Sequence, residues 1–169
     1  MNPLAASRDV ALDPSLVLAG GLLATALLTL VLSLSQGLGW SRISLPYMLG
    51  TVFTTRRSRA MIVGFGVHLV LGLVFAAGYG LIFRTIGRGG PGLGALLGAL
   101  HGLLVLTAGM DLLSAAHPRM ASRHHGPTPT RQLEPPGFLA RNYGRRTPTI
   151  TLLAHLAYGA ALGWIYGGG

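Results

Sequence analysis

The chain has 169 residues, of which half are hydrophobic and only 10% are charged, and its mean hydropathy is +0.55. Soluble domains carry about 25% charged residues, so this composition favours a membrane protein. The net charge of +9 comes from arginines that stand between long apolar runs, and this argues against the solvated basic face that nucleic-acid binding needs. The absence of cysteine excludes disulfides, thiolate metal sites and cysteine nucleophiles.

Four apolar segments predict four transmembrane helices, because each is close to or above the ~20 residues that cross a bilayer core. Helices are the expected form, since lipid offers no partner to open backbone groups. The predicted spans are residues 15–38, 60–83, 92–116 and 149–166. The first is interpreted as a retained helix, because its apolar run is about twice as long as that of a secretory signal. The sequence therefore predicts one all-α membrane domain over residues 1–169, folded as a four-helix bundle.

The arginine positions predict the orientation of the chain in the membrane. Ten of the thirteen arginines lie in the two long loops, 39–59 and 117–148. Arginine-rich loops stay in the cytoplasm, so both termini are expected outside, in a multi-pass protein of the bacterial inner membrane. The prolines of the second loop predict an irregular segment that lies against lipid headgroups or a partner. The expected contacts with the membrane surface or a partner are Arg56, Arg57, Arg145 and Arg146.

Two segments share one pattern: "HLVLGLVFAAGYG" at 68–80 and "HLAYGAALGWIYG" at 155–167. The loops before them also match, with "PYML" in the first and "PGFL" in the second. We infer that a two-helix hairpin and its preceding loop occur twice, as a parallel repeat about an axis along the membrane normal. A shared Gly/Ala/Leu composition explains the glycines, but it does not explain the matched polar and aromatic residues. The aligned pairs are His68–His155, Leu69–Leu156, Gly72–Gly159, Ala76–Gly163, Tyr79–Tyr166 and Gly80–Gly167.

Small residues recur every four positions in three of the predicted spans. Residues at this spacing share one helix face, and small side chains allow helix backbones to approach closely in lipid. We therefore expect these rows to be the contact faces of a tight bundle. The rows are Gly72, Ala76 and Gly80; Gly94, Gly98 and Gly102; and Gly159, Gly163 and Gly167.

An ionisable residue inside a membrane helix is a candidate functional site. His68 and His155 lie at similar distances beyond an arginine pair, so they are expected at one depth in the membrane. Two imidazoles from facing helices suit a b-type haem, and with Asp111 they suit a divalent metal ion. A proton relay would use the same residues. His101 lies ten residues further out than Asp111 on its helix and is expected to lie apart from this group.

A structural role for the histidines is the alternative, and it is the one we favour, with no cofactor. Each imidazole would donate a hydrogen bond to a backbone carbonyl or to Asp111, and so fix the register of its helix. Interhelical polar contacts in lipid contribute about 0.6 kcal/mol on average, which is enough to specify packing. The sequence shows no P-loop, GxSxG or HExxH motif and no paired acids on one helix, so we predict a protein without catalytic activity.

The segments "LPYMLGTVF", "GFGVHLVLG", "GALHGLLV", "HPRM" and "AHLAYGAALG" resemble a family of small uncharacterised bacterial four-helix membrane proteins, a domain of unknown function. The resemblance covers nearly the whole chain, and it implies the fold without assigning a catalytic residue. The predicted role is that of an accessory or structural subunit in a larger membrane complex, in contact with lipid and with other subunits or copies of itself. The alternatives are haem or metal binding through His68 and His155, for electron transfer or sensing, and transport of a small solute or protons.

Overall fold

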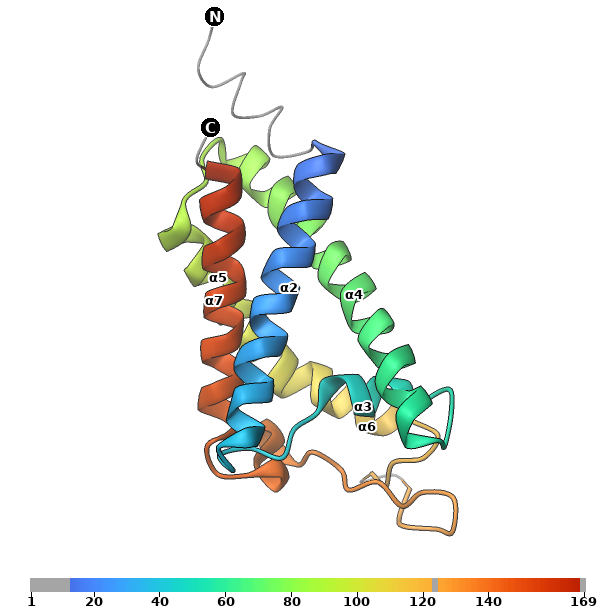
Figure 1. Ribbon diagram of the computed structural model, residues 1–169. Helices are drawn as coiled ribbons and strands as arrows, with labels where there is room; N and C mark the ends of the chain where they lie inside the picture. Colours follow the sequence, from blue (N-terminus) through green and yellow to red (C-terminus); the bar gives the residue numbers. More distant parts are fainter. Residues whose placement is uncertain (1–12, 123–124, 168–169) are drawn as a thin grey trace, which may run out of the picture. The chain divides into compact units, whose positions relative to one another are not determined.

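The computed structural model describes residues 13–122 and 125–167, and within these ranges the chain is helical and forms no β-sheet (Figure 1). One isolated bridge joins Met120 to Leu133. The helices are α2 (Pro14–Gly37), α3 (Leu45–Gly50), α4 (Arg57–Ile86), α5 (Pro91–Leu104), the π-helical turn η1 (Val105–Gly109), α6 (Met110–Ala116), the 3₁₀ segment η2 (Phe138–Tyr143) and α7 (Thr147–Gly167).

Four helical stretches of the described chain are long and apolar enough to cross a membrane: Pro14–Gly37, Arg57–Ile86, Pro91–Ala116 and Thr147–Gly167. The prediction of four long apolar helices is confirmed, and the second helix extends beyond the predicted apolar span at both ends. Helix α4 begins three residues before the predicted start and takes Arg57 and Arg59 into its first turn. It continues to Ile86, where Gly87 adopts a positive φ of 75° that ends helices readily.

The third span is not the continuous α-helix predicted over 92–116, because a π-helical turn separates α5 from α6. The Thr107 hydroxyl lies in this turn and donates to the Leu103 carbonyl at 2.8 Å. Hydroxyls that bond back to the preceding turn compete with the regular helix ladder, and π-helical turns often mark such interruptions. The loop 39–59 also differs from a plain connection, because it contains α3. Ser44 caps α3 by accepting from Tyr47 N–H.

Contacts divide the chain into two compact units, and the divisions fall inside helices. Unit 1 comprises Met1–Val31, Leu69–Gly102 and Leu152–Gly169, and unit 2 comprises Leu32–His68 and Leu103–Thr151. Each long helical span therefore contributes residues to both units. No proline-rich or glycine-rich linker marks these divisions in the sequence, because they lie within apolar runs.

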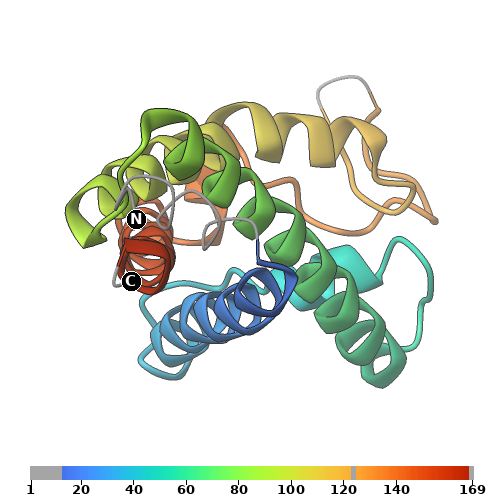
Figure 2. The ribbon, with the colours of Figure 1, turned by 90° about the horizontal axis from the view of Figure 1, so that it is seen from above.

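In unit 1, α5 and α7 pack backbone to backbone through glycines. Figure 2 shows α7, in red, beside the yellow-green α5. A Cβ atom on Gly94 would overlap the Gly159 carbonyl oxygen and lie 2.9 Å from the Gly163 Cα. A Cβ on Gly98 would overlap the carbonyl oxygen of His155. This crossing therefore tolerates no side chain, which is the geometry that small residues permit between membrane helices.

The other contact in unit 1 joins α2 to α4. A Cβ on Gly72 would overlap the Thr25 hydroxyl, and a Cβ on Gly21 would lie 3.0 Å from the Ala76 Cβ. The Thr25 hydroxyl itself donates to the Gly21 carbonyl at 2.6 Å, so this buried polar group is satisfied within its own helix. The α2–α4 contact thus combines small residues with one hydroxyl that bonds back to its helix.

In unit 2, α3 packs on the first turns of α4, again through two glycines. A Cβ on Gly50 would overlap the Ala60 carbonyl, and a Cβ on Gly64 would overlap the Pro46 carbonyl and lie 2.6 Å from Gly50 N. The short helix thus rests directly on the α4 backbone. This contact fixes where α3 presents Tyr47 and Met48 to the rest of the unit.

Candidate functional site

Two histidines meet inside unit 1, in a cluster of aromatic side chains. His101 of α5 and His155 of α7 contact each other edge to face, with ring centroids 4.8 Å apart and an interplanar angle of 80°. Phe75 covers the other side of the His101 ring at a centroid distance of 4.0 Å. The Tyr79 hydroxyl lies 3.5 Å from His101 Nδ1, at the limit of a hydrogen bond. Two imidazoles and a phenol therefore share one apolar site.

The glycine crossing of α5 and α7 produces this contact. Gly98 and Gly102 flank His101 on α5, and a Cβ on Gly102 would lie 2.9 Å from the Cβ of His155. Because α7 comes this close, its histidine can only lie beside that of α5. The expectation that His101 lies apart from His155 is therefore wrong: depth counted along each helix gives no information on which face a residue occupies.

Two tyrosines of α7 tie it to α4 within unit 1. The Tyr158 hydroxyl donates to the Gly72 carbonyl at 2.6 Å, and the Tyr166 hydroxyl donates to the Ala76 carbonyl at 3.3 Å. The acceptors are backbone groups of small residues, whose carbonyls a side chain from another helix can reach. Tyr158 is almost fully buried, at 1% exposure, and the sequence analysis did not single it out. Tyr158 lies eight residues before Tyr166 and therefore on the same helix face, and this spacing was the signal available.

The remaining predicted ligands are His68 and Asp111. His68 and Asp111 belong to unit 2, whereas His155 belongs to unit 1. His68 is buried, and Asp111 is exposed on α6. Across residues 13–122 and 125–167, no group of three or more His, Asp or Glu side chains is placed to hold a metal ion. Ligation by His68 and His155 stays a prediction, and so does the variant with Asp111.

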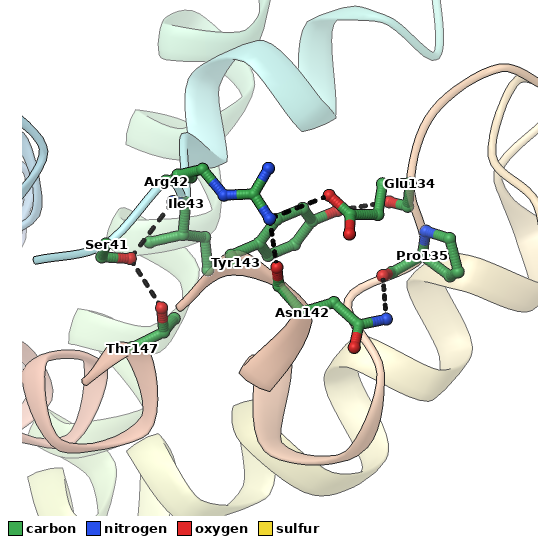
Figure 3. A network of polar contacts seen from close by, with 8 residues as sticks. All are labelled: Ser41, Arg42, Ile43, Glu134, Pro135, Asn142, Tyr143 and Thr147. Carbon is green, nitrogen blue, oxygen red and sulfur yellow. Dashed lines mark hydrogen bonds and ion pairs between the residues drawn. The ribbon is translucent and has the colours of Figure 1, made fainter. Parts of the chain in front are cut away.

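In unit 2 the two long loops pair with each other through the polar network of Figure 3. Arg42 N–H donates to the Tyr143 carbonyl at 2.7 Å, and the Arg42 guanidinium also donates to the Asn142 carbonyl. The hydroxyls of Ser41 and Thr147 lie 2.8 Å apart and are buried. These residues are about a hundred positions apart in the chain, so the network closes a long loop between the first and second halves.

This network contains one exposed ion pair and one buried tyrosine hydrogen bond. Arg42 and Glu134 form an ion pair of 3.3 Å, but their side chains are 68% and 47% exposed, so the pair contributes little to stability. The Tyr143 hydroxyl donates to the Glu134 carbonyl at 2.6 Å. Burial, with a smaller contribution from the Glu134 carboxylate, raises the pKa of Tyr143 to about 12. Tyr143 is therefore a neutral donor at any physiological pH.

His117 connects α6 to α3 in unit 2. Its Nε2 lies 3.0 Å from the Met48 carbonyl, and its Nδ1 accepts the Arg119 N–H at 3.0 Å. This pattern assigns the neutral tautomer with the proton on Nε2. The side chain is only 2% exposed. Burial is the main cause that lowers the pKa of His117; the nearby Arg119 charge adds to the shift and the bond to Met48 opposes it.

We expect unit 2 to lose stability as the pH falls below about 6.5, the ordinary pKa of histidine. The pKa of His117 is lower in the folded state than in the unfolded chain. Below about pH 6.5 the unfolded chain therefore binds more protons, and the free energy of unfolding decreases as the pH is lowered. The measurement is urea unfolding at pH 5 and pH 8, followed by Trp40 fluorescence in a Trp164→Phe background. His117→Gln should abolish the pH dependence, and His125→Gln, an exposed site in the same loop, should preserve it. A His117→Gln protein with the wild-type pH profile would contradict the assignment.

The arginines predicted to meet the membrane surface or a partner are all exposed: Arg56, Arg57, Arg145 and Arg146. The Arg146 guanidinium also lies 5.5 Å from the centroid of the Trp40 ring, in a cation–π contact.

Comparison of the chain with protein-family models, with curated proteins and with solved structures finds no match.

Proposed function

We propose that this chain is a four-span protein of the bacterial inner membrane that serves, without catalysis, as an accessory or structural subunit of a larger membrane assembly. The observation that supports membrane insertion is the distribution of side chains on the spans. Large apolar residues are exposed along α2 and α4, including Leu23, Ile62 and Val74 at 65%, 74% and 63%. The buried helix contacts use glycine, alanine and threonine instead. Lipid or another membrane subunit suits such a surface, and water does not.

The parallel repeat is part of this proposal, and equivalent contacts in the two hairpins support it. Gly72 of α4 packs against α2, its partner in the first hairpin. The aligned Gly159 of α7 packs against α5, its partner in the second hairpin. The resemblance to a family of small bacterial membrane proteins also remains a prediction.

The exposed arginines support an interface at the cytoplasmic side. A pair of exposed arginines stands at the start of α4 and another just before α7, Arg56–Arg57 and Arg145–Arg146. Arginines next to a span attract anionic lipids and acidic partners. This arrangement also supports cytoplasmic loops and external termini.

The absence of cysteine permits a direct test of orientation, since each introduced thiol is unique. Arg88→Cys places a thiol at an exposed position between α4 and α5, and Arg141→Cys places one at an exposed position between α6 and α7. A membrane-impermeant maleimide added to intact cells should label Cys at position 88 and leave position 141 unlabelled until the membrane is broken. The opposite labelling pattern would refute external termini.

Crosslinking tests the subunit role. Val74 is 63% exposed on α4, and Ala76, two residues on, is fully buried. A photoreactive maleimide on Val74→Cys in native membranes should join the chain to one protein of defined mass, and the same reagent on Ala76→Cys should not. A chain that crosslinks only to lipid, and that purifies as a lone monomer in mild detergent, would rule out the accessory role.

Metal binding is a second candidate function, favoured by the contact between His101 and His155. Neutral imidazoles suit several transition metals, and the centroids of these two rings lie 4.8 Å apart. A haem does not fit between these two rings, because rings in direct contact leave no space for a porphyrin. Metal analysis and an absorption spectrum of the purified protein decide the question. Stoichiometric metal that is lost in His101→Leu supports this candidate, and metal-free protein without a Soret band removes it together with the haem.

A further inference from the structure

Unit 2 contains a cavity of about 300 Å³ between α3 and the loop that follows α6. Polar side chains form much of its lining: Tyr47, Thr51, Thr55, Arg119, Thr130 and Gln132. No carboxylate is among its lining residues, and the one acidic residue of this loop, Glu134, is paired with Arg42. The cavity therefore offers one cation and several neutral hydrogen-bonding groups, with no negative charge to balance them.

Two hydrogen bonds hold the Arg119 side chain in place and use only some of its N–H donors. Its Nη1 donates to the carbonyls of Thr51 and Val52, in the second case at 3.0 Å, and so satisfies the C-terminal end of α3. A guanidinium has five N–H donors, and these two bonds use only those on Nη1. The Nε and Nη2 donors of a fixed guanidinium form the edge that recognises phosphate oxygens in pairs.

A second arginine stands next to the cavity. Arg131 lies in the chain between Thr130 and Gln132, which both line the cavity. Its Nη1 is buried and has no hydrogen-bond partner among the described residues. A buried cationic donor without a partner is costly, and native proteins satisfy such groups with a water or an ion. A water or an anion beside the lining residues Thr130 and Gln132 would satisfy this atom.

Two hydroxyls of the lining are also available to a ligand. Within residues 13–122 and 125–167, the hydroxyls of Tyr47 and Thr55 make no hydrogen bond, whereas the Thr51 hydroxyl donates to backbone carbonyls of α3. Hydroxyl groups beside a guanidinium complete the donor set that a tetrahedral oxyanion needs. We propose that this cavity binds a phosphate group, carried either by an anionic lipid headgroup or by free phosphate.

Purified full-length protein in a neutral detergent provides the test, with two probes. Native mass spectrometry measures binding of phosphatidylglycerol, and isothermal titration measures binding of inorganic phosphate. Arg131→Gln should weaken binding of the preferred probe about tenfold or more, since hydrogen bonds to charged groups contribute about 1.5–3 kcal/mol. Thr55→Val should weaken it severalfold. Thr55 is exposed, so we expect the fold to remain intact when it is changed, whereas Arg119→Gln would also remove the bonds to the carbonyls at the end of α3.

The control is Arg141→Gln, which removes an exposed arginine outside the lining segment, whereas Arg131 stands in the chain between the lining residues Thr130 and Gln132. Weakening by Arg131→Gln and Thr55→Val, with Arg141→Gln unchanged, supports the site. The probe that binds then identifies the source of the phosphate. Equal weakening by Arg141→Gln would show diffuse attraction and overturn the proposal. Failure of both probes to bind, or full binding by the two cavity variants, would overturn it as well.

Discussion

Replacing Gly64 by alanine is expected to destabilise unit 2 by about 3 kcal/mol, the upper part of the usual range for overpacking. A Cβ at this position would overlap the Pro46 carbonyl and lie 2.6 Å from Gly50 N. Both neighbours are backbone atoms of α3, which cannot move aside as a flexible side chain would. The helix must therefore lift from α4. The measurement is urea unfolding in detergent, followed by Trp40 fluorescence in the Trp164→Phe background.

Gly66→Ala is the matched control, because it makes the same change two residues away on the same helix. A Cβ on Gly66 would meet nothing within 4 Å. Alanine is a better helix former than glycine, so this variant should unfold at the same urea concentration as the parent or be more stable by up to about 1 kcal/mol. If both variants showed the same decrease in the free energy of unfolding, the decrease would come from the surroundings of α4 in detergent and not from its contact with α3.

The long apolar helices could be predicted from the sequence because hydrophobic length is a local property. The predicted span 60–83 lies within the observed Arg57–Ile86, and the helix extends beyond the apolar span at both ends to include arginines. Arginine is a good helix former, and its long side chain lets the first turn of a helix extend beyond the apolar core. The π-helical turn of the third span was not predictable, since Thr107 and Gly109 are common residues in membrane helices.

The site was less predictable, because contact partners are not a local property. The glycine rows were visible as a four-residue period, but the period does not say which helix meets which. It also missed Gly50, which lies in a short helix, and Gly64, which His68 separates from the Gly72 row; these two glycines face each other only after α3 has folded. His101 was placed apart from His155 for the same reason. The loop network joins Arg42 to Asn142, and no pattern in a single sequence pairs positions a hundred residues apart.

Gly159→Ala is expected to destabilise unit 1 by about 2–3 kcal/mol. A Cβ here would overlap the Gly94 carbonyl and lie 2.9 Å from the Gly98 Cα, so α5 and α7 would have to separate along their whole crossing. Gly78→Ala is the control, because a Cβ at that position of α4 would meet nothing within 4 Å. Thermal unfolding in detergent, followed by Trp164 fluorescence in a Trp40→Phe background, gives the comparison. A Gly159→Ala protein as stable as Gly78→Ala would contradict the backbone contact.

The same variant also tests whether the histidine contact depends on the glycine crossing. The rings of His101 and His155 meet because Gly98 and Gly102 allow α7 to approach α5. A single methyl group at position 159 therefore acts on the histidines without touching them. If the purified protein holds a metal ion at this pair, Gly159→Ala should lower its affinity while both ligands remain. Loss of stability with unchanged metal content would place the ion elsewhere and leave His101 and His155 as packing residues.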